Sequence, residues 1–71
     1  MITLAQIQER IAEAIRHSGM SQSELARRLG IRHQQISCYL SGQKMPALDT
    51  LANICKILGE DANYILCQDD E

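Results

Sequence analysis

Aromatic residues are scarce in this chain. It contains no tryptophan and no phenylalanine, and Tyr39 and Tyr64 are its only aromatic residues. Hydrophobic residues nevertheless make up 45% of its 71 residues, so the core is expected to be mostly aliphatic. A chain of this length that folds alone buries only about 60% of the surface exposed in its unfolded state. We therefore predict one small, compact domain over residues 1–71.

Long apolar runs are missing as well. No apolar stretch approaches the roughly 20 residues that a membrane-spanning helix needs. The N-terminus lacks the basic segment followed by an apolar one that is typical of a secretory signal. We expect a cytoplasmic protein with no membrane partner.

The three cysteines do not form a recognisable metal or redox motif. Cys38, Cys55 and Cys67 are odd in number, and no two of them have the spacing of a zinc knuckle or a thioredoxin-like site. His17 and His33 lack partners at metal-ligand spacing, so no metal is predicted. Cys55 and Cys67 are interpreted as small apolar residues.

Signatures of catalysis are also missing. The sequence has no paired nucleophile and base, no glycine-rich loop for phosphate, and no acid pair in a plausible pocket. We expect neither an enzyme nor a cofactor.

Positive charge is scarce overall but concentrated in one part of the chain. The formal net charge is −2. Residues 10–44 contain six Lys or Arg against two Glu, a balance of +4. Residues 45–71 contain one Lys against six Asp or Glu, a balance of −5, and Glu9 contributes the remaining −1. This asymmetry favours an acidic partner such as nucleic acid for the first segment, with the acidic C-terminal third turned away from it.

Apolar residues recur at helical spacing in five segments, without a strand pattern, which predicts an all-α fold. Thr3 and Gln6 have the spacing of a capping box at the start of the first helix, which is expected to end near His17 or Ser18.

The second helix has clear signals at both ends. Ser21 and Glu24 are predicted to form another capping box, and Gly30 is expected to end the helix. Taken alone, Arg27 and Arg28 are interpreted as a solvated face.

A third helix is expected after about three residues. Arg32 stands at its N-cap position, where Ser, Thr, Asn or Asp would add about 1 kcal/mol. Ser41 and Gly42 are expected to end it. Its buried side is predicted to contain three residues: Ile36, Tyr39 and Leu40.

Two further helices are predicted. The fourth follows Pro46 and is closed by Gly59. Asp61 is expected to cap a short fifth helix that includes Ala62 to Leu66. Residues 67–71 are predicted to form a solvated acidic tail.

Residues 21–41 have the organisation of a helix-turn-helix unit, in which two short helices are joined by a tight turn with glycine. The major groove of DNA is about 12 Å wide and admits one α-helix, whose N-terminal side chains contact base edges. Four polar residues, Arg32 to Gln35, begin the third helix. Because a glutamine amide offers a donor and an acceptor together, it can bind adenine through two hydrogen bonds. This run is therefore interpreted as reaching for base edges and phosphates.

Several motifs together resemble the lambda-repressor/Cro-type (XRE-like) helix-turn-helix family. They are SQSELA at residues 21–26, the Gly30–Ile31 turn, Ile36–Ser37, the Ser41–Gly42 helix end, and P-x-L-x-T-L at residues 46–51. The resemblance covers about residues 7–66. It implies a five-helix repressor-like domain that binds a double-stranded DNA operator, usually as a two-fold homodimer.

The resemblance also implies roles for individual residues. Gln22 matches a glutamine that binds a phosphate and braces the start of the recognition helix, although it can also be read as a simple helix-start residue. The positions that face bases are matched by His33, Gln34, Ser37 and Cys38. Further contacts to the backbone or its phosphates are matched by Gln35, Ser41, Gln43 and Lys44.

Alternative readings of these side chains stay open. His33 can be an ordinary surface histidine, and Cys38 can contact a thymine methyl group or only permit close approach. Tyr39 is interpreted as a packing residue whose hydroxyl can reach a phosphate. Arg32 is interpreted as a phosphate contact, which would explain why a poor cap is tolerated.

The chain departs from the family pattern at two aligned positions. Where many relatives have a basic residue late in the first helix paired with an acid near the end of the third, this chain has Ile15 and Leu40. Replacing both members of a semi-buried ion pair by hydrocarbon is often neutral or stabilising. We predict that Ile15 and Leu40 touch. The overall acidity also predicts modest non-specific DNA binding.

The sequence favours a small repressor, such as a control protein of a phage or mobile element. It would span two half-sites of a palindromic operator, about 34 Å apart, and block an overlapping promoter. Two glutamines and a histidine favour an A·T-containing site. Pairing is expected through the fifth helix around Tyr64, Ile65 and Leu66, or through the exposed side of the fourth. The alternative is an antitoxin-type module that binds a partner toxin and regulates its own operon.

Overall fold

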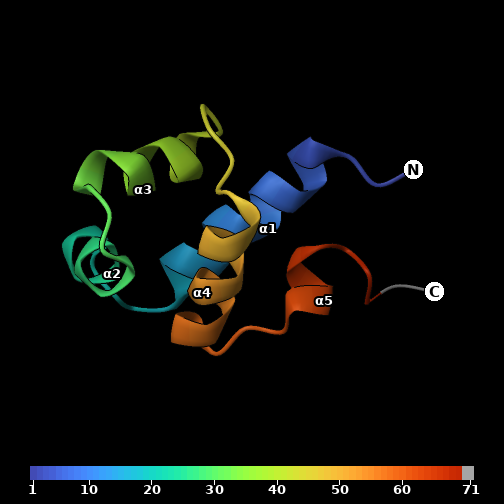
Figure 1. The fold of residues 1–71 in the computed structure, drawn as a ribbon. Coiled ribbons are helices and arrows are strands. Elements are labelled where there is room, and N and C mark those ends of the chain that lie inside the picture. The colour runs from blue at the N-terminus through green and yellow to red at the C-terminus, as the bar shows by residue number, and fades with distance from the viewer. Residues whose placement is uncertain (70–71) are drawn as a thin grey trace.

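The computed structural model describes residues 1–69, and within that range it is all-helical, with no strand. The helices are α1 (Leu4–His17), α2 (Gln22–Leu29), α3 (His33–Ser41), α4 (Leu48–Leu58) and α5 (Ala62–Ile65). Figure 1 shows α2 and α3 at one end of the domain and α5 at the other, with α4 crossing α1 between them. The prediction of an all-α, five-helix fold is confirmed.

The ends of α1 follow from local hydrogen bonding. The hydroxyl of Thr3 accepts from the backbone N–H of Gln6 at 3.2 Å, and Oε1 of Gln6 accepts from the N–H of Thr3 at 2.8 Å. This is the predicted capping box, which satisfies two of the amides that a helix start leaves without partners.

The start of α2 is only partly as predicted. Ser21 caps the helix by accepting from the N–H of Glu24 at 3.1 Å. The carboxylate of Glu24, however, bonds Arg27 at 2.6 Å and Arg28 at 2.8 Å. The second half of the predicted capping box is therefore wrong, because two cations one turn further along attract the carboxylate more strongly than a backbone amide does.

Each helix contributes one aliphatic residue to the centre of the core. These five side chains are all less than 2% exposed: Ile11, Leu25, Ile36, Ile54 and Ile65. Burying one such side chain fully stabilises the fold by about 1.5–3 kcal/mol. Tyr39 is 5% exposed and packs with them, so its reading as a packing residue is confirmed. Cys55 is buried and Cys67 is half-buried.

The C-terminal segment packs onto α1. Asp61 caps α5 by accepting from the N–H of Asn63 at 2.9 Å, as predicted, but the helix ends at Ile65 rather than Leu66. Beyond it, the carboxylate of Asp69 lies 2.6 Å from a guanidinium nitrogen of Arg10. Gln68 and Asp69 are exposed, as predicted for a solvated tail, but the ion pair attaches Asp69 to α1; residues 70–71 lie outside the described residues.

Tyr64 also faces α1. Its hydroxyl donates to the carboxylate of Glu13 at 2.9 Å, and the guanidinium of Arg10 lies 4.4 Å from the centre of its ring. Ile65 is in the core and is 1% exposed. The expectation that Ile65 pairs two copies is wrong, because α5 already uses this side chain to close the domain.

Ile15 and Leu40, which stand where many relatives have an ion pair, are both part of the apolar packing. Ile15 is 3% exposed in the core, and Leu40 is a partly buried residue packed against the same cluster. A direct contact between the two side chains remains a prediction.

Replacing Leu40 with glutamate is expected to lower the free energy of unfolding by roughly 1–3 kcal/mol, because the carboxylate would lose water without gaining a partner. Adding Ile15→Arg should restore part of this loss by recreating the ion pair. Denaturant unfolding of both single variants and the double variant measures the coupling between the sites. Losses that simply add would argue against a contact between positions 15 and 40.

Candidate nucleic-acid interface

The turn between α2 and α3 sets the angle between these two helices. Gly30 ends α2 with φ of +71°, a left-handed conformation that glycine adopts without steric cost. The N–H of Ile31 then donates to the carbonyl of Ala26 at 3.0 Å, and Ile31 packs against the core. This closed turn confirms the predicted helix-turn-helix organisation.

The start of α3 is capped by its own third residue. Arg32 occupies the N-cap position, and its N–H donates to Oε1 of Gln35 at 3.1 Å. Gln35, predicted to lie near the DNA backbone, thus uses its amide oxygen within the helix and can offer only its NH2 group outward. The N–H of Gln35 in turn donates to the carbonyl of Arg32 at 3.0 Å, so the amide that a better N-cap side chain would bond already has a partner.

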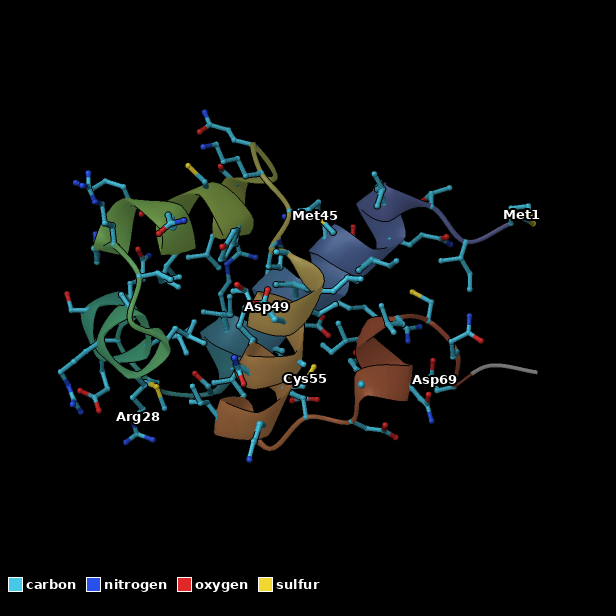
Figure 2. The ribbon with its side chains drawn as sticks, in the orientation of Figure 1. Met1, Arg28, Met45, Asp49, Cys55 and Asp69 are labelled. Atoms are coloured by element: carbon cyan, nitrogen blue, oxygen red, sulfur yellow. The ribbon has the colours of Figure 1, made fainter. Side chains whose placement is uncertain are left out.

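The outer side of α3 carries most of the predicted base-contacting residues. His33, Gln34 and Ser37 are exposed, while Cys38 is half-buried. Figure 2 shows side chains ending in nitrogen, oxygen or sulfur on the outer side of α3 and on the loop that follows it. Ile36 and Tyr39, on the opposite side, are buried. The helix therefore presents one polar face to solvent while the other is fixed in the core.

Gln22 connects the start of α2 with the middle of α3. The hydroxyl of Ser37 donates to Oε1 of Gln22 at 2.9 Å. Because this bond occupies the amide oxygen, the NH2 group of Gln22 is the part that can donate to an anion. The contact brings together a predicted phosphate-contacting residue and a predicted base-contacting residue.

The segment after α3 is held by local hydrogen bonds. The hydroxyl of Ser41 donates to the carbonyl of Cys38 at 3.2 Å and accepts from the N–H of Gln43 at 3.4 Å. Oε1 of Gln43 accepts from the thiol of Cys38 at 3.5 Å. Ser41, Gln43 and Lys44 are all exposed. The structure thus places the three predicted phosphate-contacting residues together at the end of α3.

The basic side chains of α2, α3 and the segment after α3 differ in their surroundings. Arg32 and Lys44 lie at the two ends of α3 and are exposed, whereas Arg27 and Arg28 share the carboxylate of Glu24. Arg10 lies on the other side of the domain, against α5 and Asp69. The positive balance of residues 10–44 is therefore only partly directed towards the outer side of α3.

The cluster around Glu24 gives a pH-dependent contribution to stability. Hydrogen bonds from Arg27 and then Arg28 lower the pKa of Glu24 from 4.5 to about 2. Since the pKa is depressed in the folded state, the stabilisation is present above pH 4.5 and is lost as the pH falls towards 2.

Glu24→Gln is therefore expected to flatten the fall in melting temperature between pH 4.5 and pH 2. Thermal unfolding at several pH values measures this. Glu9→Gln, which changes an exposed carboxylate elsewhere, is the control. If both variants keep the same slope as the wild type, the Glu24 cluster does not control acid stability.

Two important residues were missed by sequence reasoning. Gln8 donates from α1 to carbonyl groups near the end of α3, and Arg10 joins α1 to both α5 and Asp69. Their partners lie between 31 and 59 positions away in the chain, so no local motif marks them.

Among residues 1–69, no three His, Cys, Asp or Glu side chains gather where they could hold a metal ion. In the same part of the chain, none of the helices is both long enough and apolar enough to span a membrane.

The fold and the exposed face of α3 define a helix-turn-helix protein, and comparison with known proteins agrees. A family model described as helix-turn-helix matches residues 8–65, and the chain belongs to this family. It is similar to the HTH-type transcriptional regulator for conjugative element R391 of Providencia rettgeri and to that for conjugative element SXT of Vibrio cholerae. Each is 37% identical over 65 residues, which is 92% of this chain and 30% of the relative. No solved structure gives a significant match.

Proposed function

We propose that this chain is a sequence-specific, double-stranded DNA-binding domain of a transcriptional regulator, acting in the cytoplasm. The observation that carries this proposal is the exposed polar face of α3, which includes His33, Gln34 and Ser37, opposite a buried face formed by Ile36 and Tyr39. A helix held in this way enters the major groove with its N-terminal residues against base edges. The regulatory function named for the similar proteins supports the same assignment.

In this proposal, Gln34 and its neighbours His33, Ser37 and Cys38 read bases, while flanking residues contact the backbone. Two groups of backbone contacts surround the reading face. One contains Gln22, Arg32 and Gln35 near the start of α3, and the other contains Ser41, Gln43 and Lys44 beyond its end. Contacts to phosphate orient the domain, and contacts to base edges provide sequence preference.

We further propose a homodimer that binds a palindromic operator and represses by covering a promoter. Between the two surfaces expected to pair, we favour the exposed side of α4, because Ile65 of the fifth helix is in the core and Leu48 at the start of α4 is 86% exposed. The chain spans 30% of the length of the regulators that it matches, so these assembly and regulatory features are proposed for the domain by analogy with its family.

Selection of duplexes from a random library tests the proposed function. We expect palindromic winners with A·T-containing half-sites about 34 Å apart, and sedimentation of the complex should show two protomers on each duplex. A salt titration should give a shallow slope for unrelated duplexes, since few cations face the DNA. Equal affinity for every duplex, or none for any, would overturn sequence-specific binding.

A further inference from the structure

The C-terminal end of α3 is closed by a side chain from α1. The last four carbonyl groups of a helix have no partner within it. The amide nitrogen of Gln8 donates hydrogen bonds to the carbonyl oxygens of Tyr39 and Leu40, each at 3.2 Å. One NH2 group carries two hydrogens, so it can satisfy both carbonyls. Gln8 is half-buried between the helices, and it therefore fixes the end of α3 on α1.

Gly42 brings the backbone against the same side chain. It ends α3 with φ of +83°, and a Cβ built on it would lie 3.3 Å from Cδ of Gln8. Gly59 has a similar φ of +70°, but a Cβ there would meet nothing within 4 Å. A side chain at position 42 would therefore push the Gln8 amide by a few tenths of an ångström, in addition to straining the left-handed backbone.

The backbone fixed in this way includes the proposed phosphate-contacting segment. Ser41 and Gln43 flank Gly42, and the N–H of Lys44 donates back to the carbonyl of Cys38 at 3.4 Å. Contacts to phosphate determine the register of a protein on the duplex. Loss of the Gln8 contacts would therefore loosen the segment whose placement determines that register.

We propose that Gln8 is a positioning residue for DNA binding. Its amide holds the end of α3 and residues 41–44 on α1, and in this way presents the backbone-contacting groups beyond α3 to the phosphates. This inference rests on the proposed DNA-binding function. Gln8 acts through the end of α3 and does not itself contact the bases.

Gln8→Met tests the proposal, because it keeps the length of the side chain, adds no charge and removes both donor hydrogens. Measured well below the melting temperature on the selected duplex, its dissociation constant should rise about tenfold. The slope of log affinity against log salt should become shallower by about 1 per protomer, equal to roughly one lost phosphate contact.

Gln6→Met is the matched control on the same helix. It removes the 2.8 Å hydrogen bond that Gln6 accepts from the N–H of Thr3, at the start of α1. We expect a similar loss of thermal stability but no change in operator affinity or salt slope. A purely structural role for Gln8 would make the two variants behave alike.

A second pair of variants keeps the proposal testable if Gln8→Met folds poorly. Gly42→Ala and Gly59→Ala both place an alanine in a left-handed conformation, but only the first pushes a Cβ against Gln8. Gly42→Ala should weaken operator binding about tenfold, and Gly59→Ala should leave the affinity of the folded protein unchanged.

The possible outcomes separate this inference from the proposed function. If wild-type protein binds the operator and Gln8→Met binds it with the same affinity and salt slope, the positioning role is overturned while DNA binding stands. If the wild type binds no duplex, the proposed function is overturned. Amide hydrogen exchange in the free protein then still tests whether Gln8 holds residues 41–44 in place. These residues should exchange faster in Gln8→Met than in Gln6→Met.

Discussion

Gln34→Ala is expected to weaken binding to the selected operator by about 1–3 kcal/mol per half-site, while affinity for unrelated duplexes hardly changes. The reason is the position of Gln34, which is exposed in the first turn of α3 beside the groove that the helix is proposed to enter. A glutamine amide paired with adenine loses both hydrogen bonds when it is truncated. Titration of the selected and an unrelated duplex at one salt concentration measures the ratio.

Gln68→Ala is the control for this prediction, because Gln68 is an exposed glutamine beyond α5 and away from α3. It should bind both duplexes as the wild type does. An equal loss for both duplexes in Gln34→Ala would assign Gln34 to the phosphate backbone. No loss for either would remove it from the interface.

Truncation after Gly59 is expected to unfold the domain rather than give a folded monomer. It removes Ile65, which is 1% exposed in the core, together with the contacts of Tyr64 and Asp69 to α1. Domains gain only about 0.05–0.15 kcal/mol of net stability per residue, so the loss of a central core residue is a large fraction of the total. Loss of the cooperative transition in circular dichroism would show this.

A single substitution separates the core contribution of Ile65 from the rest of the segment. Ile65→Ala should cost about 2–5 kcal/mol in the free energy of unfolding, as is typical for a buried Ile or Leu. Leu4→Ala removes apolar atoms from a side chain that is 69% exposed, and it should cost less than about 0.5 kcal/mol. Similar costs for the two variants would contradict the placement of α5 in the core.

The helices could be predicted because their signals are local. Thr3, Ser21 and Asp61 all accept from a backbone amide two or three residues later, as capping residues do. The aliphatic core could be predicted as well, since apolar periodicity identifies the inward face of each helix without knowledge of its neighbours. Glu24 shows where this approach fails, because a local cap competed with two nearby cations and lost.

Contacts between distant parts of the chain could not be predicted in the same way. Asp69 was expected in a solvated tail because its neighbourhood is acidic and polar, but it pairs with Arg10, 59 positions earlier. The candidate site also combines features that local sequence predicts with contacts that it does not predict. The outward face of α3 follows from sequence, whereas the bond from Ser37 to Gln22 and the support of α3 by Gln8 depend on how the helices pack.

Single-atom changes in the selected operator test most directly whether α3 lies in the major groove. Replacing one adenine by 7-deazaadenine removes an acceptor from the major groove only, and 3-deazaadenine does the same in the minor groove. We predict that 7-deazaadenine weakens binding at a matching position in each half-site, while 3-deazaadenine has little effect. Binding that tolerates every 7-deazaadenine substitution but is lost with 3-deazaadenine would contradict the account.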